Sequence, residues 1–226
     1  VENKYGYRYG KWLTASLYAK CEFVGVSKGD SSCKVEYAYD LPNLQDEKVH
    51  LVYEVYGDGK IIVDMSYQPV VSEIEMPVFG LIFQLYKDME EVNYYGFGPE
   101  ENYIDRNKGA LLGKYTYQVT DNLTPYLYPQ ECGNRTHVRE LSVAGENTKL
   151  KIKGEDFEFS ALHYTPYELE NARHKDELPN IYQTVLCINE KQMGIAGDDT
   201  WGAKTHDEFL LDKEKHHLRF SFKGKL

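Results

Sequence analysis

Apolar and polar residues alternate along several stretches of this 226-residue chain, and the alternation restricts the possible folds more than any other feature. Between residues 33 and 41 every second residue is apolar, namely Cys33, Val35, Tyr37, Tyr39 and Leu41. A period of two places one set of side chains on each face of a β-strand. Residues 49–55 and 61–67 repeat the pattern on either side of Gly57-Asp58-Gly59, which predicts a β-hairpin.

Further strand-like patterns follow along the chain, and we predict strands at 77–85, 115–119, 137–143, 149–153, 156–163, 182–189, 207–212 and 216–222. The run 77–85 is continuously apolar, which predicts a strand covered on both faces. Thr165-Pro166-Tyr167-Glu168 is a capping box, which predicts a helix to about residue 174. We therefore expect residues 1–226 to form a single all-β domain of antiparallel strands with one short helix.

The N-terminal residues 1–19 differ from this pattern. They are rich in aromatic residues, among them Trp12, and show no strand alternation. Exposed aromatic clusters usually mark an interface. We interpret residues 1–19 as a segment that packs on the core or on a neighbouring domain.

Charge and cysteine content narrow the class of partner. Asp and Glu number 36 against 26 Lys and Arg, and the net charge of −10 disfavours nucleic acids and anionic membranes as partners. The longest apolar runs have strand length, so none is predicted to span a bilayer. The four cysteines show no CxxC spacing, and three lie in strand-like contexts where a buried thiol is the default. We expect reduced, structural cysteines in a cytoplasmic protein.

A glycine-punctuated loop at residues 192–206 carries the most distinctive residues. Trp201 lies on this polar loop, so its indole either plugs the end of a sheet or contacts a ligand. The adjacent Asp198 and Asp199 could form an acid/base pair, but neighbouring side chains usually point in different directions. We therefore predict that both, with Gly197, shape the loop by accepting backbone N–H bonds. His206 is a candidate ligand-binding residue.

Two other loops, residues 94–106 and 124–141, combine carboxylates, amides, arginines and aromatics. This mixture recognises sugars, because planar rings stack on C–H faces and bidentate groups bind vicinal hydroxyls. For Glu131, Asn134 and Arg135 two interpretations stay open, sugar binding and internal hydrogen bonding. We interpret four others as a buried hydrogen-bonded framework: Asp105, Arg106, Arg139 and Glu140. No spacing indicates zinc, a phosphate-binding loop or a nucleophile elbow.

Three sequence stretches, taken together, resemble a known family. They are Tyr95-Gly-Phe-Gly-Pro-Glu-Glu-Asn-Tyr-Ile-Asp-Arg, then Thr124-Pro-Tyr with the following Pro-Gln-Glu and Gly-Asn-Arg, and then Met193-Gly-Ile with Gly-Asp-Asp-Thr-Trp. They are similar, in this order, to the C-terminal domain of β-galactosidases, the family-two glycoside hydrolases of the lac-operon type. In some of these enzymes this part is a separate small subunit. The resemblance runs from about Tyr9 to the C-terminus.

The resemblance implies a large antiparallel β-sandwich, a supersandwich of the galactose-mutarotase-like type. It also implies that the catalytic glutamates and associated magnesium lie on a separate barrel, with magnesium and sodium in the complete enzyme and no catalytic residue, metal or cofactor in this chain. The expected partners are the remaining domains or large subunit, a galactoside substrate and further subunits of an oligomer. The residue matching the family's sugar-stacking tryptophan is Trp201. The family's domain normally begins upstream of the position of Val1, so we expect a truncated domain start.

Two alternatives belong to other functional classes. A free aldose mutarotase needs a histidine acid and a carboxylate base across the sugar ring, for which the candidates are His137, His163, His206 and Glu131. A stand-alone carbohydrate-binding module would need only the loops at residues 94–106, 124–141 and 192–206, without any catalytic residue.

Overall fold

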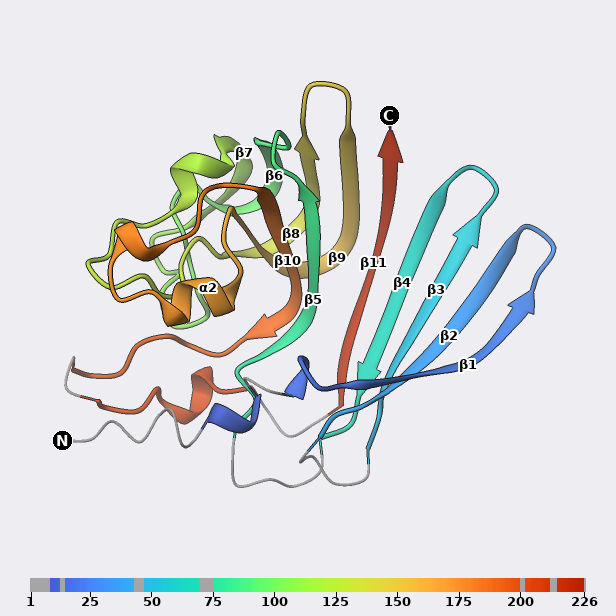
Figure 1. Cartoon of the computed structure of the whole chain (residues 1–226), viewed down its shortest axis with the longest axis horizontal. Helices are drawn as coiled ribbons and strands as arrows, with labels where there is room; N and C mark the ends of the chain where they lie inside the picture. The colour runs from blue at the N-terminus through green and yellow to red at the C-terminus, as the bar shows by residue number, and fades with distance from the viewer. Residues whose placement is uncertain are drawn as a thin grey trace. The chain divides into compact units, whose positions relative to one another are not determined.

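The structure is a computed structural model that describes residues 9–12, 15–42, 47–69, 75–199, 202–211 and 215–225 (Figure 1). In this part the strands are β1 Lys20–Lys28, β2 Ser32–Asp40, β3 Val49–Tyr56, β4 Lys60–Tyr67, β5 Val78–Tyr86, β6 Glu91–Gly98, β7 Leu111–Gln118, β8 Arg135–Ala144, β9 Lys149–Leu162, β10 Gln183–Gln192 and β11 His216–Lys225.

Helical structure is sparse in the described part of the chain. It consists of α2 Pro166–Asn171, the 3-10 turns η1 Val119–Asn122, η2 Lys175–Glu177 and η3 Asp207–Phe209, and helical residues 9–12 and 15. Together with antiparallel pairing throughout the registered strand pairs, this confirms the predicted all-β fold. The helical residues near the N-terminus add to the single short helix that we predicted. No helix of the described residues is long and apolar enough to cross a membrane.

The chain divides into two compact units, each with its own buried residues. Unit 1 comprises Val1–Phe79 and Glu190–Phe222, and unit 2 comprises Gly80–Asn189 and Lys223–Leu226. Buried apolar residues of unit 1 include Leu51, Val63, Met65, Tyr67, Phe79, Leu218 and Phe220. Those of unit 2 include Val92, Tyr103, Ile152, Phe157, Phe159, Leu186 and Ile188. The prediction of one domain over residues 1–226 stays a prediction.

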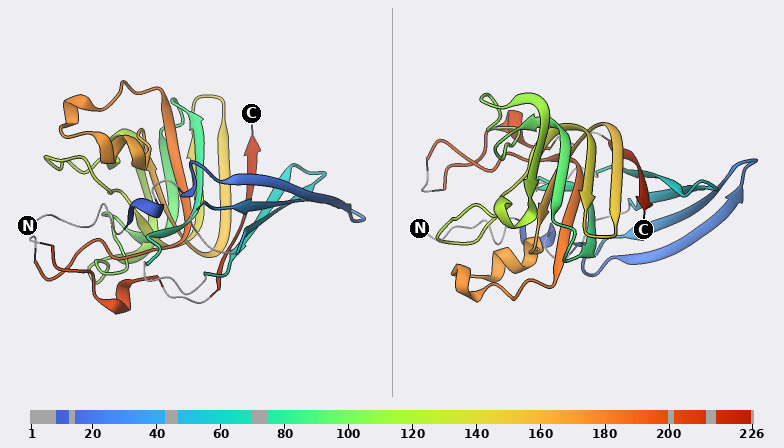
Figure 2. Two further views of the ribbon diagram at one scale, coloured as in Figure 1. Left: turned by 60° about the horizontal axis from the view of Figure 1, so that its bottom comes forward. Right: turned by 90° about the horizontal axis from the view of Figure 1, so that it is seen from above.

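The strands of unit 1 follow the alternation of the sequence. They lie in the order β1-β2-β3-β4-β11, and β1 to β4 form two successive long hairpins (Figure 2). The predicted turn between β3 and β4 is confirmed, because Gly59 has a positive φ of 82° and its N–H donates to Tyr56 O at 3.0 Å. A residue without Cβ adopts this conformation at no steric cost.

In unit 2 the strand order is β7-β6-β8-β9, and β10 pairs with both β9 and β5. β9 is continuous over residues 149–162, whereas we predicted two strands separated at about residue 154. It pairs with β8 from Lys149 to Phe159, with two register shifts, and its last five residues pair with β10. Pairing with β8 on both sides of residue 154 therefore replaces the predicted break.

Two strand predictions differ from the structure. β5 covers the predicted run, but it pairs only with β10 among the described strands, and Ile82 is 56% exposed. The prediction of a strand covered on both faces is therefore wrong, because Val78, Ile82 and Tyr86, which share one face of the strand, are exposed. Residues 207–212 were expected to form a strand, yet the structure has the turn η3 at Asp207–Phe209.

The capping box of α2 is confirmed. Thr165 Oγ1 accepts the N–H of Glu168 at 3.1 Å, and the Glu168 carboxylate accepts the N–H of Thr165 at 2.7 Å. The helix ends at Asn171, three residues before the predicted end. Such reciprocal bonds satisfy two backbone donors at the start of the helix.

The four cysteines, which all lie in described segments, are free thiols as predicted. Burial raises the pKa of Cys132 to about 11 and that of Cys187 to about 12, so both remain protonated thiols. Cys21 is exposed and Cys33 is half-buried, so the expectation of burial in strands is wrong for these two.

Gly80 of β5 provides a stability test for the pairing of β5 with β10. A Cβ atom there would lie 2.1 Å from Asn189 Oδ1 and 2.6 Å from Ile188 O, which forces the strands apart. We expect Gly80→Ala to lower the free energy of unfolding by about 2 kcal/mol, as overpacking does. The matched control is Gly25→Ala in β1, where a Cβ meets nothing within 4 Å. Urea unfolding measures both, and equal stability of the two variants would contradict the β5–β10 contact.

Candidate functional site

The carboxylate of Glu101 joins two of the loops that the sequence singled out. It accepts hydrogen bonds from Gly133 N at 2.6 Å, Thr124 Oγ1 at 2.9 Å and Tyr126 Oη at 3.3 Å. It also forms an ion pair with Arg106. Burial raises the pKa of Glu101, but these hydrogen bonds and the Arg106 charge outweigh burial and hold it below its ordinary value of 4.5.

Asn102 and Asn134 interlock the same two loops beside Glu101. Asn102 N donates to Asn134 O at 2.9 Å, and Asn134 Nδ2 donates back to Asn102 O at 3.2 Å. Asn102 Oδ1 accepts both the N–H and the hydroxyl of Thr136, and Asn134 Nδ2 also donates to Glu158 at 3.1 Å. Asn134 is 0% exposed. Its amide nitrogen therefore serves the interior of unit 2.

Arg135 is directed into the protein as well, with 5% of its surface exposed. Its guanidinium donates to Tyr94 Oη, Gly133 O and Asn122 Oδ1 at 3.1–3.2 Å. The group lies 5.9 Å from the ring centre of Tyr94 and 5.2 Å from that of Tyr117. Charge-assisted hydrogen bonds and cation–π contacts of this kind offset the cost of burying the charge.

Glu131 is half-buried and accepts a hydrogen bond from Tyr103 Oη at 3.2 Å. Burial, and secondarily the charge of Glu131, raises the pKa of Tyr103 far above its ordinary value, so the phenol stays a neutral donor. For Asn134 and Arg135, and less completely for Glu131, these contacts favour internal hydrogen bonding, one of the two interpretations that the sequence left open. Their role in sugar binding stays a prediction.

The predicted buried framework is found in part. Arg106 and Glu140 are exposed, the first paired with Glu101 and the second with a lysine of β9, so the prediction of burial is wrong for both. Arg139 is half-buried and its guanidinium lies 5.9 Å from the ring centre of Tyr95. The sequence reasoning missed Glu101 and Asn102 as the central residues, although both stand in the motif Gly-Pro-Glu-Glu-Asn.

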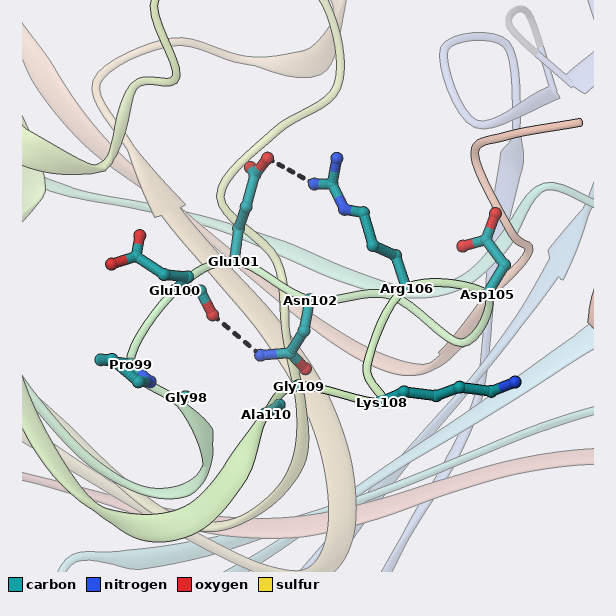
Figure 3. Close-up of a pocket in the computed structure, with 10 residues that line it drawn as sticks. All are labelled: Gly98, Pro99, Glu100, Glu101, Asn102, Asp105, Arg106, Lys108, Gly109 and Ala110. Carbon is teal, nitrogen blue, oxygen red and sulfur yellow. Dashed lines mark hydrogen bonds and ion pairs between the residues drawn. The ribbon is translucent and has the colours of Figure 1, made fainter. Parts of the chain in front are cut away.

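An open hollow of about 660 Å³ lies beside this network in unit 2 (Figure 3). The ion pair of Glu101 and Arg106 forms one part of its wall, and the side chain of Lys108 extends along another. The described residues that line it are Gly98, Pro99, Glu100, Glu101, Asn102, Asp105, Arg106, Lys108, Gly109 and Ala110. The hollow offers charged and amide groups for hydroxyls, but none of these described lining residues has an aromatic ring on which a sugar could stack.

The third loop, residues 192–206, belongs to unit 1. Asp199 Oδ1 accepts the N–H of Ala203 at 3.2 Å, as expected of a loop-shaping carboxylate. Asp198 instead pairs with His206, whose Nε2 lies 2.8 Å from Asp198 Oδ1. A Cβ on Gly197 would lie 2.3 Å from Ala203 O, so the backbone crosses too closely there for any other residue. The sequence did not predict the pairing of Asp198 with His206.

Trp201, the main predicted sugar-binding residue, lies outside the described residues. The chain on either side of it is anchored at its base. Met193 N donates to Pro77 O at 2.9 Å, and Gly194 N donates to Phe209 O at 2.8 Å. Thr205 Oγ1 donates to Gly194 O at 3.1 Å.

The histidines considered for mutarotase chemistry each have a carboxylate partner other than Glu131. His137 Nδ1 lies 3.1 Å from Asp156, and the buried His163 has its Nε2 2.7 Å from Glu90. His206 pairs with Asp198 as described. Among the described residues, no three His, Cys, Asp or Glu side chains cluster as metal ligands.

Comparison with known proteins identifies relatives over nearly the whole chain. Residues 2–223 match the family model described as "Beta galactosidase small chain". The β-galactosidase of Streptococcus thermophilus is 39% identical over 220 residues, which are 96% of this chain and 21% of that protein. The β-galactosidase of Halalkalibacterium halodurans is 38% identical over 222 residues, 96% of this chain and 22% of that protein.

The chain therefore spans about a fifth of the length of the curated relatives it matches. Among solved structures, the GalM/aldose epimerase homologue from C. elegans aligns with a TM-score of 0.47 and 12% identity, over 92% of this chain and 69% of that one.

Glu101→Gln tests the importance of the carboxylate network. The amide cannot hold Arg106 and donates where the carboxylate accepted, so we expect a loss of about 2 kcal/mol in the free energy of unfolding at pH 7. Because the folded pKa is lowered, the carboxylate's contribution is complete above pH 4.5 and vanishes as the pH falls through the folded pKa. The difference between wild type and variant should therefore shrink in acid.

The control for this variant is Glu140→Gln, which removes the exposed ion pair with Lys153. Exposed pairs contribute little, so its stability should stay close to that of the wild type. A Glu101→Gln variant as stable as this control across the pH range would contradict the role assigned to Glu101.

Proposed function

Because this chain belongs to the family of β-galactosidase small chains, we propose that it is the C-terminal domain or a small-subunit fragment of a lac-operon-type β-galactosidase, a family-two glycoside hydrolase. The complete enzyme would hydrolyse terminal β-D-galactosides such as lactose with retention of configuration. The observation that carries the proposal is the match over residues 2–223, together with 39% identity to a β-galactosidase along 96% of the chain.

The proposal assigns the bond-breaking chemistry to the rest of the enzyme. The relatives are about five times as long as the aligned region, which leaves room for a separate barrel with the catalytic glutamates. We assign magnesium and sodium to that part as well, as the resemblance of the three sequence stretches to this family implies. The partners are then the remaining domains or the large subunit, in an oligomer. Four free cysteines support placing this enzyme in the cytoplasm.

Within this enzyme, the third loop contributes Trp201 as a stacking surface for the sugar. The loop is supported on both sides of residue 201, by the hydrogen bond from Ala203 to Asp199 and by the pair of His206 with Asp198. A loop held at its base can present an indole in a fixed orientation. An aromatic face of this kind binds the C–H surface of a galactose ring, and His206 is the neighbouring polar candidate.

The isolated chain should not hydrolyse β-galactosides, since the proposal places both catalytic glutamates outside it. A chromogenic β-galactoside tests this directly, with the complete enzyme as the positive control. Turnover by the rigorously purified chain would contradict the proposed division of labour. Polarimetry on α-galactose and a galactose titration on the same sample test the mutarotase and the carbohydrate-binding module, and a positive result in either would favour that alternative.

In the complete enzyme, Trp201→Ala should raise KM more than it lowers kcat, because stacking holds the substrate before the reaction. Ring stacking contributes about 1 kcal/mol beyond area burial, so the effect should be several-fold to about tenfold. Trp201→Phe should retain part of the affinity. If Trp201 is instead a core plug, the alanine variant will lose several degrees of Tm with unchanged KM, which would contradict the stacking role.

A further inference from the structure

The first four strands of unit 1 form a sheet with one apolar face. The register places Cys21 beside Tyr39, Phe23 beside Tyr37 and Val26 beside Val35. Residues directly opposite each other on antiparallel strands share a face. Continuing across β3 and β4, this apolar face also contains Cys33, Val49, Leu51, Tyr53, Val55, Ile61, Val63 and Met65. The ring contacts of Tyr37, with Phe23 at 5.9 Å and Tyr53 at 6.3 Å, show the continuity of the face.

The opposite face of the same sheet is polar. Its register brings Ser27 beside Lys34, Lys34 beside Glu54 and Val52 beside Asp64. Asp64 forms an ion pair with Arg219 of β11, and its carboxylate also lies 2.9 Å from His217 Nε2. The opposite face therefore carries charged residues, whereas most of the apolar face carries none.

Burial of the apolar face stops part of the way across the sheet. Leu51, Val63 and Met65 are buried, whereas Phe23 is 59% exposed and Val26 is 53% exposed. Val55 and Cys21 are exposed too. A contiguous apolar area on one sheet face, next to residues that are already buried, is typical of a surface that packs against another protein segment.

The geometry points to the face rather than the edge of β1 as the contact. β1 has a β-bulge between Phe23 and Gly25 and a lysine at each end, Lys20 and Lys28. Bulges and lysines discourage the addition of another strand to an edge. A partner that packs side chains onto Phe23 and Val26 meets neither obstacle.

We propose that the apolar face of β1 and β2, centred on Phe23 and Val26, is the surface on which this chain packs against the remainder of the β-galactosidase. The occupant follows from length, since this chain is about a fifth of the relatives that it matches along 96% of its own residues. In such proteins the other four-fifths of the polypeptide accompanies each copy of this region. It can therefore cover an apolar surface permanently. This inference rests on the proposed function. It does not depend on the identity of the substrate or on the stacking role of Trp201.

A photo-cross-linking experiment on the complete enzyme identifies the occupant. Phe23→p-benzoylphenylalanine keeps an aromatic ring on the apolar face, and Lys34→p-benzoylphenylalanine places the same probe on the exposed polar face as the matched control. After irradiation, mass spectrometry should find the Phe23 probe joined to a segment outside these 226 residues and the Lys34 probe joined to none. Cross-links to residues 80–189 of this chain, or to Phe23's own region in a second copy, would overturn the proposal.

Alkylation of Cys21 supplies a second readout without a probe. Cys132 and Cys187 are buried thiols of raised pKa and Cys33 is half-buried, and peptide mapping by mass spectrometry reads the label on Cys21 separately from any label on Cys33. In the complete enzyme Cys21 should react at least about tenfold more slowly than the thiol of Lys34→Cys on the opposite face. Equal rates, or absence of a Phe23 cross-link, would overturn the docking surface even if the enzyme hydrolyses β-galactosides. Failure of the proposed function would be recognised separately, because the intact complete enzyme would then not hydrolyse β-galactosides.

Discussion

The carboxylate of Glu101 is the contact on which the polar interior of unit 2 depends. It lies just beyond the end of β6 and accepts hydrogen bonds from the loop that leads into β8, so separating the two loops would remove these bonds from a half-buried carboxylate. The Asn102–Asn134 pair beside it satisfies backbone groups that the sheets do not reach. Buried polar groups need partners, and here the partners come from the other loop.

This dependence explains why a sugar-site pattern and a structural network are difficult to distinguish in a sequence. Carboxylates, amides and arginines in glycine-rich loops suit both purposes, and burial alone separates them. Asn134 and Arg135 are buried and bonded to their own chain, while the hollow beside Glu101 is lined by different residues. The residue types were predictive of hydrogen bonding, but the direction of each side chain depends on contacts between segments about 30 positions apart.

Local features were the predictable ones, for the same physical reason. The turn at Gly57-Asp58-Gly59 and the capping box at Thr165 involve residues within three or four positions of each other, and both were found where the sequence placed them. The exposure of one face of β5 depends on which segments pack against it, and the continuity of β9 depends on its pairing with β8 and β10. Neither property can be predicted from the alternation of apolar and polar residues within a single strand. The exposure of Phe23 belongs to this second group.

Unit 1 joins the proposed docking face to the third loop through packed side chains. Tyr67 of β4 stacks on Phe79 at 6.3 Å, and Phe79 lies 5.6 Å from the ring of His216. His216 Nδ1 lies 2.8 Å from Glu190, at the end of β10 that leads into the loop. Because these contacts are buried or partly buried, β4 is packed against the base of the loop. A partner that covers the face of β1 and β2 would therefore contact the same run of strands that, at β4, supports the base of the third loop.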